Sequence, residues 1–180
     1  IYPDGGVARL RVYGEVFKNW QLVDEKEQID LAAATNGGKA IACNDMFFSA
    51  MGNLIMPGRG INMGDGWETK RNRTPGNRDW VILRMATAGS IEKIIVDTCH
   101  FKGNYPDSCS IEACMSNDDD VVLDNSNEWK TILPAQKLSA DNEHEYMNEI
   151  QNPGIYSHVR LNIFPDGGIS RLRLFGKRKK

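Results

Sequence analysis

Residues 163–176 read IFPDGGISRLRLFG, and residues 1–14 read IYPDGGVARLRVYG. The two stretches are identical at nine of 14 aligned positions, and the other five are conservative exchanges such as Tyr2 for Phe164. Their offset of 162 residues is the length of a domain and exceeds the roughly 20 to 50 residues of a solenoid repeat. We therefore expect a tandem duplication, with one whole copy and the end of its predecessor in this chain. We further expect the chain to be a fragment or a processed piece.

The second stretch has the pattern of two strands joined by a turn. In residues 156–164, apolar side chains alternate with polar ones, which is the period of a half-buried strand. The next four residues, Pro165 to Gly168, have the backbone preferences of a turn. In residues 171–174, leucines alternate with arginines. The sequence predicts an antiparallel hairpin with Arg171 and Arg173 facing outward, either in surface ion pairs or docking one repeat or subunit on another.

Other segments predict the same class of structure. Four segments are rich in β-branched and aromatic residues and are strand candidates: 80–87, 91–99, 110–115 and 129–133. Residues 21–34 form the one convincing helical pattern, with acidic residues early and glycines after the end. Several short strands with little helix indicate an all-β, antiparallel sandwich.

Residues 44–79 contain six glycines and few β-forming residues, so they are expected to be mostly loop. A loop of this length in a compact domain is often functional. It carries four arginines, whose guanidinium groups suit a planar carboxylate, and three candidate acids or bases: Asp45, Asp65 and Glu68. A solvated loop with surface ion pairs explains this composition equally well.

A second polar group, residues 97–104, follows the strongest predicted strand. It contains His100, whose side chain titrates closest to neutrality and suits general acid or base catalysis. A histidine that only satisfies a hydrogen bond at the strand end is an equal alternative.

Composition and motifs exclude several classes of protein. A net charge of -2 and a pI near 6.0 disfavour a nucleic-acid or anionic-membrane binder. The chain lacks an apolar run long enough to span a membrane, and it lacks nucleotide-binding, serine hydrolase and zincin motifs. The four cysteines lack zinc-ligand spacing, so we expect free, largely buried thiols and predict no metal or other cofactor.

Three groups of residues together resemble the allantoicase family. They are the duplicated stretch, residues 45–73 (DMFFSAMGNLIMPGRGINMGDGWETKRNR, preceded by Asn44) and residues 97–115 (DTCHFKGNYPDSCSIEACM). The resemblance covers nearly the whole chain in order. It implies a jelly-roll β-sandwich like that of galactose-binding domains, present twice in the full protein. It also implies hydrolysis of allantoate to ureidoglycolate and urea.

The resemblance divides the chain into four parts. Residues 1–16 would be the last strand of a preceding repeat, 17–38 a linker that can be helical, 39–176 the second repeat, and 177–180 a basic tail. Loss of urea from allantoate requires a cation for the carboxylate, a general acid, a base and amide-type partners. Residue type and place in these motifs give the candidates: His100, Glu68 and Asp45 as catalytic groups, and Arg71, Arg73, Lys102, Asn104 and Trp67 as substrate-binding groups.

Two alternative functions stay open from sequence. One is a non-catalytic jelly-roll module that binds carbohydrate or another ligand, and the other is a related enzyme that releases urea from ureidoglycolate. For the allantoicase interpretation we expect allantoate as the small-molecule partner, a homo-oligomer, no nucleic-acid or membrane partner, and an intracellular location in the cytoplasm or the peroxisome.

Overall fold

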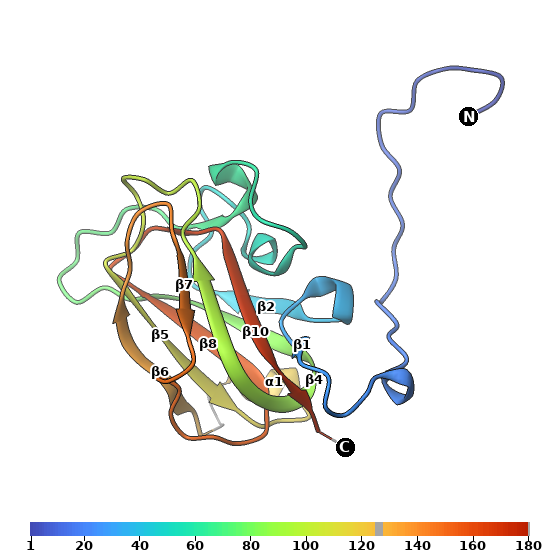
Figure 1. Cartoon of the computed structure of the whole chain (residues 1–180). Helices are drawn as coiled ribbons and strands as arrows, with labels where there is room; N and C mark the ends of the chain where they lie inside the picture. The colour runs from blue at the N-terminus through green and yellow to red at the C-terminus, as the bar shows by residue number, and fades with distance from the viewer. Residues whose placement is uncertain (125–127, 180) are drawn as a thin grey trace.

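A computed structural model describes residues 1–124 and 128–179 of the chain (Figure 1). Antiparallel strands dominate these residues, and the only α-helix among them is α1 (Asp119–Leu123). The strands are β1 (Ile29–Asp30), β2 (Lys39–Cys43), β3 (Trp67–Glu68), β4 (Asp79–Asp97), β5 (Ser108–Cys114), β6 (Lys130–Lys137), β7 (Glu143–Tyr146), β8 (Tyr156–Phe164), β9 (Gly168–Ile169) and β10 (Arg171–Arg178). Short 3-10 turns occur at η1 (Trp20–Leu22), η2 (Ala34–Asn36), η3 (Met51–Ile55) and η4 (Met63–Asp65).

The long strand β4 belongs to both layers of the sandwich (Figure 1). Its first part, residues 79–84, pairs with β2 on one side and with β8 on the other. Its last part, residues 89–97, pairs with β10 and, from 94 onward, with β7. The first layer continues from β8 through β5 to β6, and the second layer ends at β1 beside β10. The predicted all-β jelly-roll sandwich is confirmed.

The prediction of two strands at 80–87 and 91–99 is wrong in one respect, because they form one continuous strand. The register shifts between Arg84 and Gly89, where β4 passes from one layer to the other. Gly89 allows this passage, since a side-chain carbon there would collide with the backbone of Lys177 in β10. The Ala-Gly-Ser triplet that resembles a turn is therefore the bend of a strand shared by two sheets.

The predicted hairpin at residues 156–176 is also wrong. Strand β8 pairs with β4 and β5, whereas β10 pairs with β4 and β1, so the two strands lie in different layers. Residues 165–170 cross from one layer to the other at one end of the sandwich. The apolar face of β10 is as predicted, because Leu172 and Leu174 are completely buried. The half-buried pattern predicted for residues 156–164 is wrong, because His158 and Asn162 are buried too.

The core lies between the two layers and is made of side chains from both. It includes Val81 and Leu83 of β4 and Leu161 and Ile163 of β8 on one side, with Leu174 of β10 on the other. These five side chains are fully buried. Removing water from this apolar surface is the main force that holds the layers together.

Residues 1–17 are exposed, and the first 13 of them lie away from the sandwich (Figure 1). Residues 14–16 border a hollow beside the start of β2. The α-helix predicted over 21–34 does not form, and the segment contains η1, β1 and the start of η2 instead. Tertiary pairing overrides the local pattern there, because Ile29 and Asp30 pair with β10. At the other end, β10 includes the first two residues of the expected basic tail, and Lys180 lies outside the described residues.

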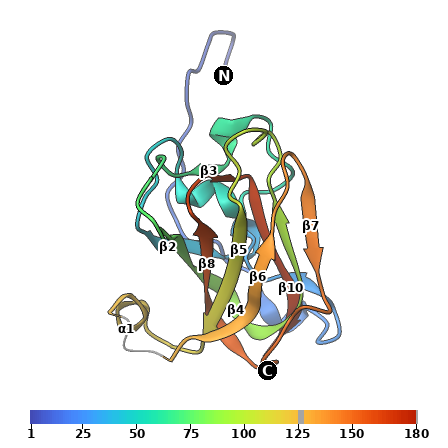
Figure 2. The ribbon, with the colours of Figure 1, turned by 90° about the vertical axis from the view of Figure 1, so that its left-hand side faces the viewer.

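The loop predicted over residues 44–79 is largely confirmed. Apart from η3, η4, the two residues of β3 and the start of β4, it has no regular structure. It covers the end of the sandwich opposite to α1 (Figure 2). Among the described residues, no helix has the length and apolar character needed to cross a bilayer.

Candidate functional site

A cleft of about 540 Å³ opens at the end of the sandwich that carries the long loop. Three segments contribute most of its lining: residues 68–71 at the end of β3, residues 103–107 after β4, and residues 165–167 between β8 and β9. The cleft is therefore built where three connections meet over the ends of the strands. This is the usual position for a site on a rigid β scaffold.

The PDGG turn holds the walls of this cleft together. Strand β9 pairs with β3, with Gly168 opposite Glu68. The N–H of Gly168 donates to the carbonyl oxygen of Asn104 at 2.8 Å, and the N–H of Thr69 donates to that of Gly167 at 3.1 Å. Gly167 has a φ of 137°, and a side-chain carbon on Gly168 would collide with the buried ring of Phe101. Both glycines are thus needed for the turn to pack against the cleft wall.

Glu68 and Asn104 form the polar centre of the cleft. Nδ2 of Asn104 donates a short hydrogen bond to Oε1 of Glu68, and the same nitrogen lies 3.8 Å from Sδ of Met63. Both residues are partly buried. The contact joins two segments 36 residues apart and fixes the orientation of the carboxylate.

Arg71 contributes an exposed side chain to the same cleft. The cleft also contains two carboxylates that the sequence interpretation did not select. Oδ2 of Asp166 accepts from the N–H of Asn72 at 2.9 Å, and Oδ1 of Asp107 accepts from Nζ of Lys137 at 2.6 Å. The bond from Lys137 lowers the pKa of Asp107. A sequence signal existed for Asp166, because it belongs to the duplicated motif that was interpreted only as a turn.

Asp45 and Trp67 do not line the cleft, but their hydrogen bonds hold the loop that forms one of its walls. Oδ1 of Asp45 accepts from the N–H of Lys70 at 2.8 Å, and its backbone carbonyl accepts from Nε1 of Trp67 at 2.8 Å. Trp67 is completely buried. Asp45 lines a smaller, separate hollow with Lys70 and Asp79. Arg73 is exposed and is not among the residues that line the main cleft.

His100 and Lys102 belong to the segment after β4 that also carries Asn104, but they lie outside the main cleft. Nε2 of His100 is 2.9 Å from the carbonyl oxygen of Gly60, and its backbone N–H donates to Oδ1 of Asp141 at 2.7 Å. Nζ of Lys102 is 3.8 Å from Oδ2 of Asp141. Neither side chain is among those lining the main cleft, so the predicted residues divide into two groups.

Arg171 does not face outward as predicted. It is 3% exposed, forms an ion pair with Asp65 at 2.8 Å, and donates to the carbonyl of Gly58 at 3.1 Å. Arg173 is also largely covered and lies 3.6 Å from a carboxylate oxygen of Asp30. The long loop folds back over this face of β10, which local alternation cannot reveal. The arginines thus attach the loop to the sandwich.

A family model described as "Allantoicase repeat" matches residues 29–179, which is most of the chain. The chain belongs to the allantoicase family. The match begins at residue 29, where Ile29 enters the core, inside the segment expected to be a linker.

Curated relatives agree with this assignment. Proteins named "Probable allantoicase" from Pseudomonas fluorescens and Photobacterium profundum are 60% and 57% identical over 182 and 178 residues. These matches include 100% and 98% of this chain and 55% and 54% of the relatives. The chain therefore spans about half the length of the curated relatives it matches.

Solved structures give the same family and a wider fold group. An allantoicase from Saccharomyces cerevisiae superimposes with a TM-score of 0.74 at 41% identity, covering 86% of this chain and 45% of that one. A family 32 carbohydrate-binding module from Streptococcus pneumoniae superimposes with a TM-score of 0.58 at 10% identity, covering 83% of this chain and 100% of the module. The second likeness shows the fold alone.

Proposed function

We propose that the protein containing this chain is a hydrolase of purine breakdown that converts allantoate and water to ureidoglycolate and urea. The observation that carries the proposal is the family assignment, which joins an allantoicase repeat model to relatives of that name. The cleft supports it, because a carboxylate, a carboxamide and a guanidinium group converge there.

The substrate explains why these three groups are needed. Allantoate has one carbon that bears a hydrogen, a carboxylate and two ureido groups. One ureido group must leave as urea while the nitrogen of the other supplies electrons to the same carbon. A site for this reaction needs a cation for the carboxylate, a group that moves protons between the nitrogens, and hydrogen-bond partners for the ureido groups.

We assign the carboxylate of the substrate to Arg71 and the proton transfers to Glu68. The guanidinium group of Arg71 offers two parallel donors to a planar carboxylate. Glu68 is oriented by Nδ2 of Asn104, which leaves the amide oxygen of Asn104 to accept from a ureido N–H. Asp107 and Asp166 also line the cleft, where they accept from Nζ of Lys137 and from the N–H of Asn72, respectively.

The steps balance with these residues. Glu68 takes the N–H proton of the retained ureido group as a C=N bond forms, and it delivers this proton to the departing nitrogen as the other C–N bond breaks. Water then adds to the C=N bond, with its oxygen on carbon and one proton passed to nitrogen through Glu68. The products are urea and ureidoglycolate, and Glu68 ends as a carboxylate. Acid–base groups in such roles contribute about 10² to 10⁴ in rate.

Urea release from allantoate by the whole protein tests the proposal. We expect turnover, and we expect Glu68→Gln to lower kcat/KM by about 10² or more because the amide cannot accept the proton. Arg78→Ala is the matched control, since Arg78 is an exposed residue of the same loop and is not among the cleft lining. Ligand binding without turnover would favour the carbohydrate-binding alternative, and urea release only from ureidoglycolate would favour the related enzyme.

We also infer that residues 1–16 end a preceding repeat. In the duplicated motif, Leu10 and Val12 correspond to Leu172 and Leu174. Their exposed fractions here are 86% and 87%. A strand of this composition needs a second sandwich to bury it. Limited proteolysis would test the inference: these residues should be cleaved rapidly in this chain and protected in the whole protein.

We further propose that the whole protein forms a homo-oligomer and is located inside the cell. Phe47 and Phe48 are 69% and 62% exposed beside the cleft, and exposed aromatic patches are often interfaces. The four cysteines are free, as predicted, which fits a reducing compartment. The curated relatives named above are bacterial and give the peroxisomal alternative no support. Light scattering after size exclusion would contradict the oligomer if it gave the mass of one subunit.

A further inference from the structure

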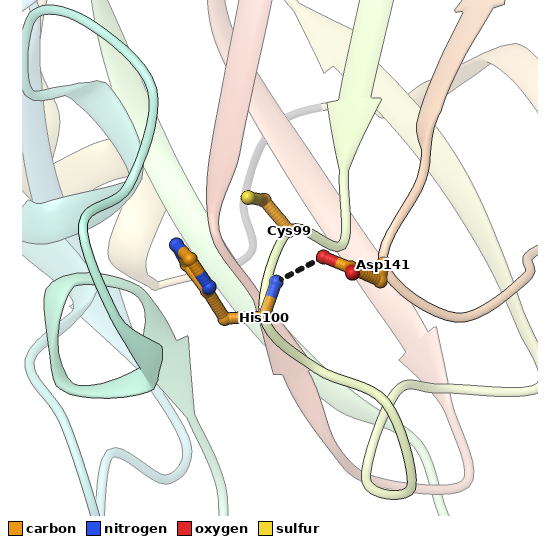
Figure 3. Close-up of side chains that lie close together, drawn as sticks. All are labelled: Cys99, His100 and Asp141. Carbon is orange, nitrogen blue, oxygen red and sulfur yellow. Dashed lines mark hydrogen bonds between the residues drawn. The ribbon is translucent and has the colours of Figure 1, made fainter.

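We propose that Cys99, His100 and Asp141 form a binding site for one divalent cation of borderline character, with Zn²⁺ as the best-fitting ion. Cys99 and His100 follow β4, and Asp141 lies in the turn between β6 and β7 (Figure 3). One candidate ligand atom from each side chain lies within 4.8 Å of the other two. The site is distinct from the cleft that contains Glu68.

The donor set selects the class of ion. A sulfur, an imidazole nitrogen and a carboxylate oxygen are the ligands that Zn²⁺ takes in proteins, at about 2.0 to 2.3 Å. Three such atoms around one tetrahedral ion lie about 3.5 Å apart, so the three side chains need only a small contraction. Mg²⁺ and Ca²⁺ prefer sites made only of oxygen. Three protein ligands leave a fourth position for water.

The hydrogen bonds of His100 prepare it as a ligand. Nε2 lies 2.9 Å from the carbonyl oxygen of Gly60, and a carbonyl can only accept, so Nε2 carries the proton. The other nitrogen, Nδ1, then has a free lone pair. Histidines that bind metals usually donate their second N–H to a carbonyl or a carboxylate in this way.

The carboxylate of Asp141 is held by the backbone of His100. The N–H of His100 donates to Oδ1 of Asp141 at 2.7 Å, as Figure 3 shows. Both residues have positive φ values, 71° for His100 and 51° for Asp141. Non-glycine residues seldom adopt this conformation, and functional sites are among the places where it is maintained.

The charged groups around the site are of both signs. Cys99 is buried, and its backbone N–H donates to Oδ1 of Asp97 at 2.8 Å, which places a second carboxylate beside the site. Arg59 is paired with Asp97 at 3.0 Å, which offsets its repulsion of an ion. Lys102 is exposed and can turn into solvent.

Cobalt(II) is the probe that tests the site, because it replaces zinc and absorbs light when a thiolate binds it. The whole protein is first freed of metals with a chelator and then titrated with Co²⁺. We expect a thiolate-to-cobalt absorption band that saturates with ion and is lost when excess Zn²⁺ is added. Cys99→Ser should abolish the band, and Cys43→Ser, a change of a free thiol elsewhere, should leave it unchanged.

Asp141→Asn provides a second test if Cys99→Ser fails to fold, since Asp141 is exposed and its replacement preserves shape. It should weaken binding by more than the roughly 10-fold that loss of an outer-shell partner costs, because a neutral amide replaces a charged ligand, while circular dichroism stays unchanged. Absence of a saturable band in the wild-type protein would overturn the proposal. So would a band that persists in Cys99→Ser, or affinity in Asp141→Asn equal to that of the wild type.

Discussion

Asn104 donates a hydrogen bond from Nδ2 to Oε1 of Glu68 and thereby joins the segment after β4 to β3 across the cleft. The two residues are brought together by Gly168, which pairs with Glu68 and donates to the carbonyl of Asn104. The orientation of the proposed catalytic carboxylate therefore depends on the PDGG turn as well as on its own loop.

Replacing Asn104 by aspartate should shift the pH dependence of the reaction. The new side chain would place a second carboxylate against Glu68, and like charges at this distance raise the apparent pKa of the pair. The carboxylate form of Glu68 would then appear only at higher pH, so the acidic limb of the pH profile of kcat/KM should shift to higher pH.

The pH profile of urea release measures this shift. The control is Asn117→Asp, which adds the same charge beside α1 at the opposite end of the sandwich (Figure 2). An acidic limb at the same pH in Asn104→Asp and in the wild type would contradict the role assigned to Glu68.

Gly168→Ala should destabilise the protein because the new methyl group would meet the ring of Phe101. Overpacking of a filled site costs about 1 to 3 kcal/mol, here in the free energy of unfolding measured with denaturant. Gly103→Ala is the control, since Gly103 is nearby and a side-chain carbon there has no neighbour within 4 Å. Equal stability of the two variants would show that the turn tolerates a side chain.

The predicted hairpin of residues 156–176 does not form, because local sequence identifies a turn without giving the partner of the strand that follows it. Pro165 to Gly168 have the same turn chemistry whether the chain returns along its own sheet or crosses to the other one. The crossing is determined by β4, because its two halves pair with β8 and β10 in different layers. Alternation identified the apolar face of each strand, because side chains on a strand have a period of two in either arrangement. It did not reveal that His158, Asn162 and Arg171 on the polar faces are buried as well.

Residue type suggests candidates for the site from sequence alone, but it does not give their arrangement in space. Glu68, Arg71 and Asn104 come together although Asn104 is distant in sequence, because β9 pairs with β3 and contacts the loop after β4. His100 is four residues before Asn104 but bonds to Gly60 instead. The direction in which a loop side chain points depends on backbone angles such as the positive φ of His100, which composition does not reveal.

Asp65→Asn should reduce stability most at neutral pH. The hydrogen bond from Arg171 lowers the pKa of Asp65 in the folded state. A lowered folded pKa contributes stability above the unfolded value of about 3.9, and this contribution is lost as the pH falls through the folded pKa. The variant should lose about 1 to 3 kcal/mol at pH 7, because buried Arg171 would lack a charged partner.

Denaturant unfolding at pH 7 and at about pH 3 separates this effect from a general loss of packing. The difference between wild type and Asp65→Asn should shrink at the lower pH. Asp107→Asn is the comparison, because Lys137 also lowers the pKa of Asp107 but does so at the surface, where ion pairs contribute little. A difference that is independent of pH would contradict the role of the Arg171 pair.

The four cysteines should differ in reactivity in the order of their burial. Burial raises the pKa of Cys109 to about 12 and that of Cys114 to about 11, so almost none of either thiol is ionised near neutral pH. The thiolate is the reactive form, and both side chains are also closed to reagents. Cys43 is only half-buried and should be alkylated first by iodoacetamide, as mass spectrometry of digested samples would show. Cys109 and Cys114 should react only after unfolding in guanidinium, and their rapid alkylation in the native protein would mean that β5 opens from the sandwich.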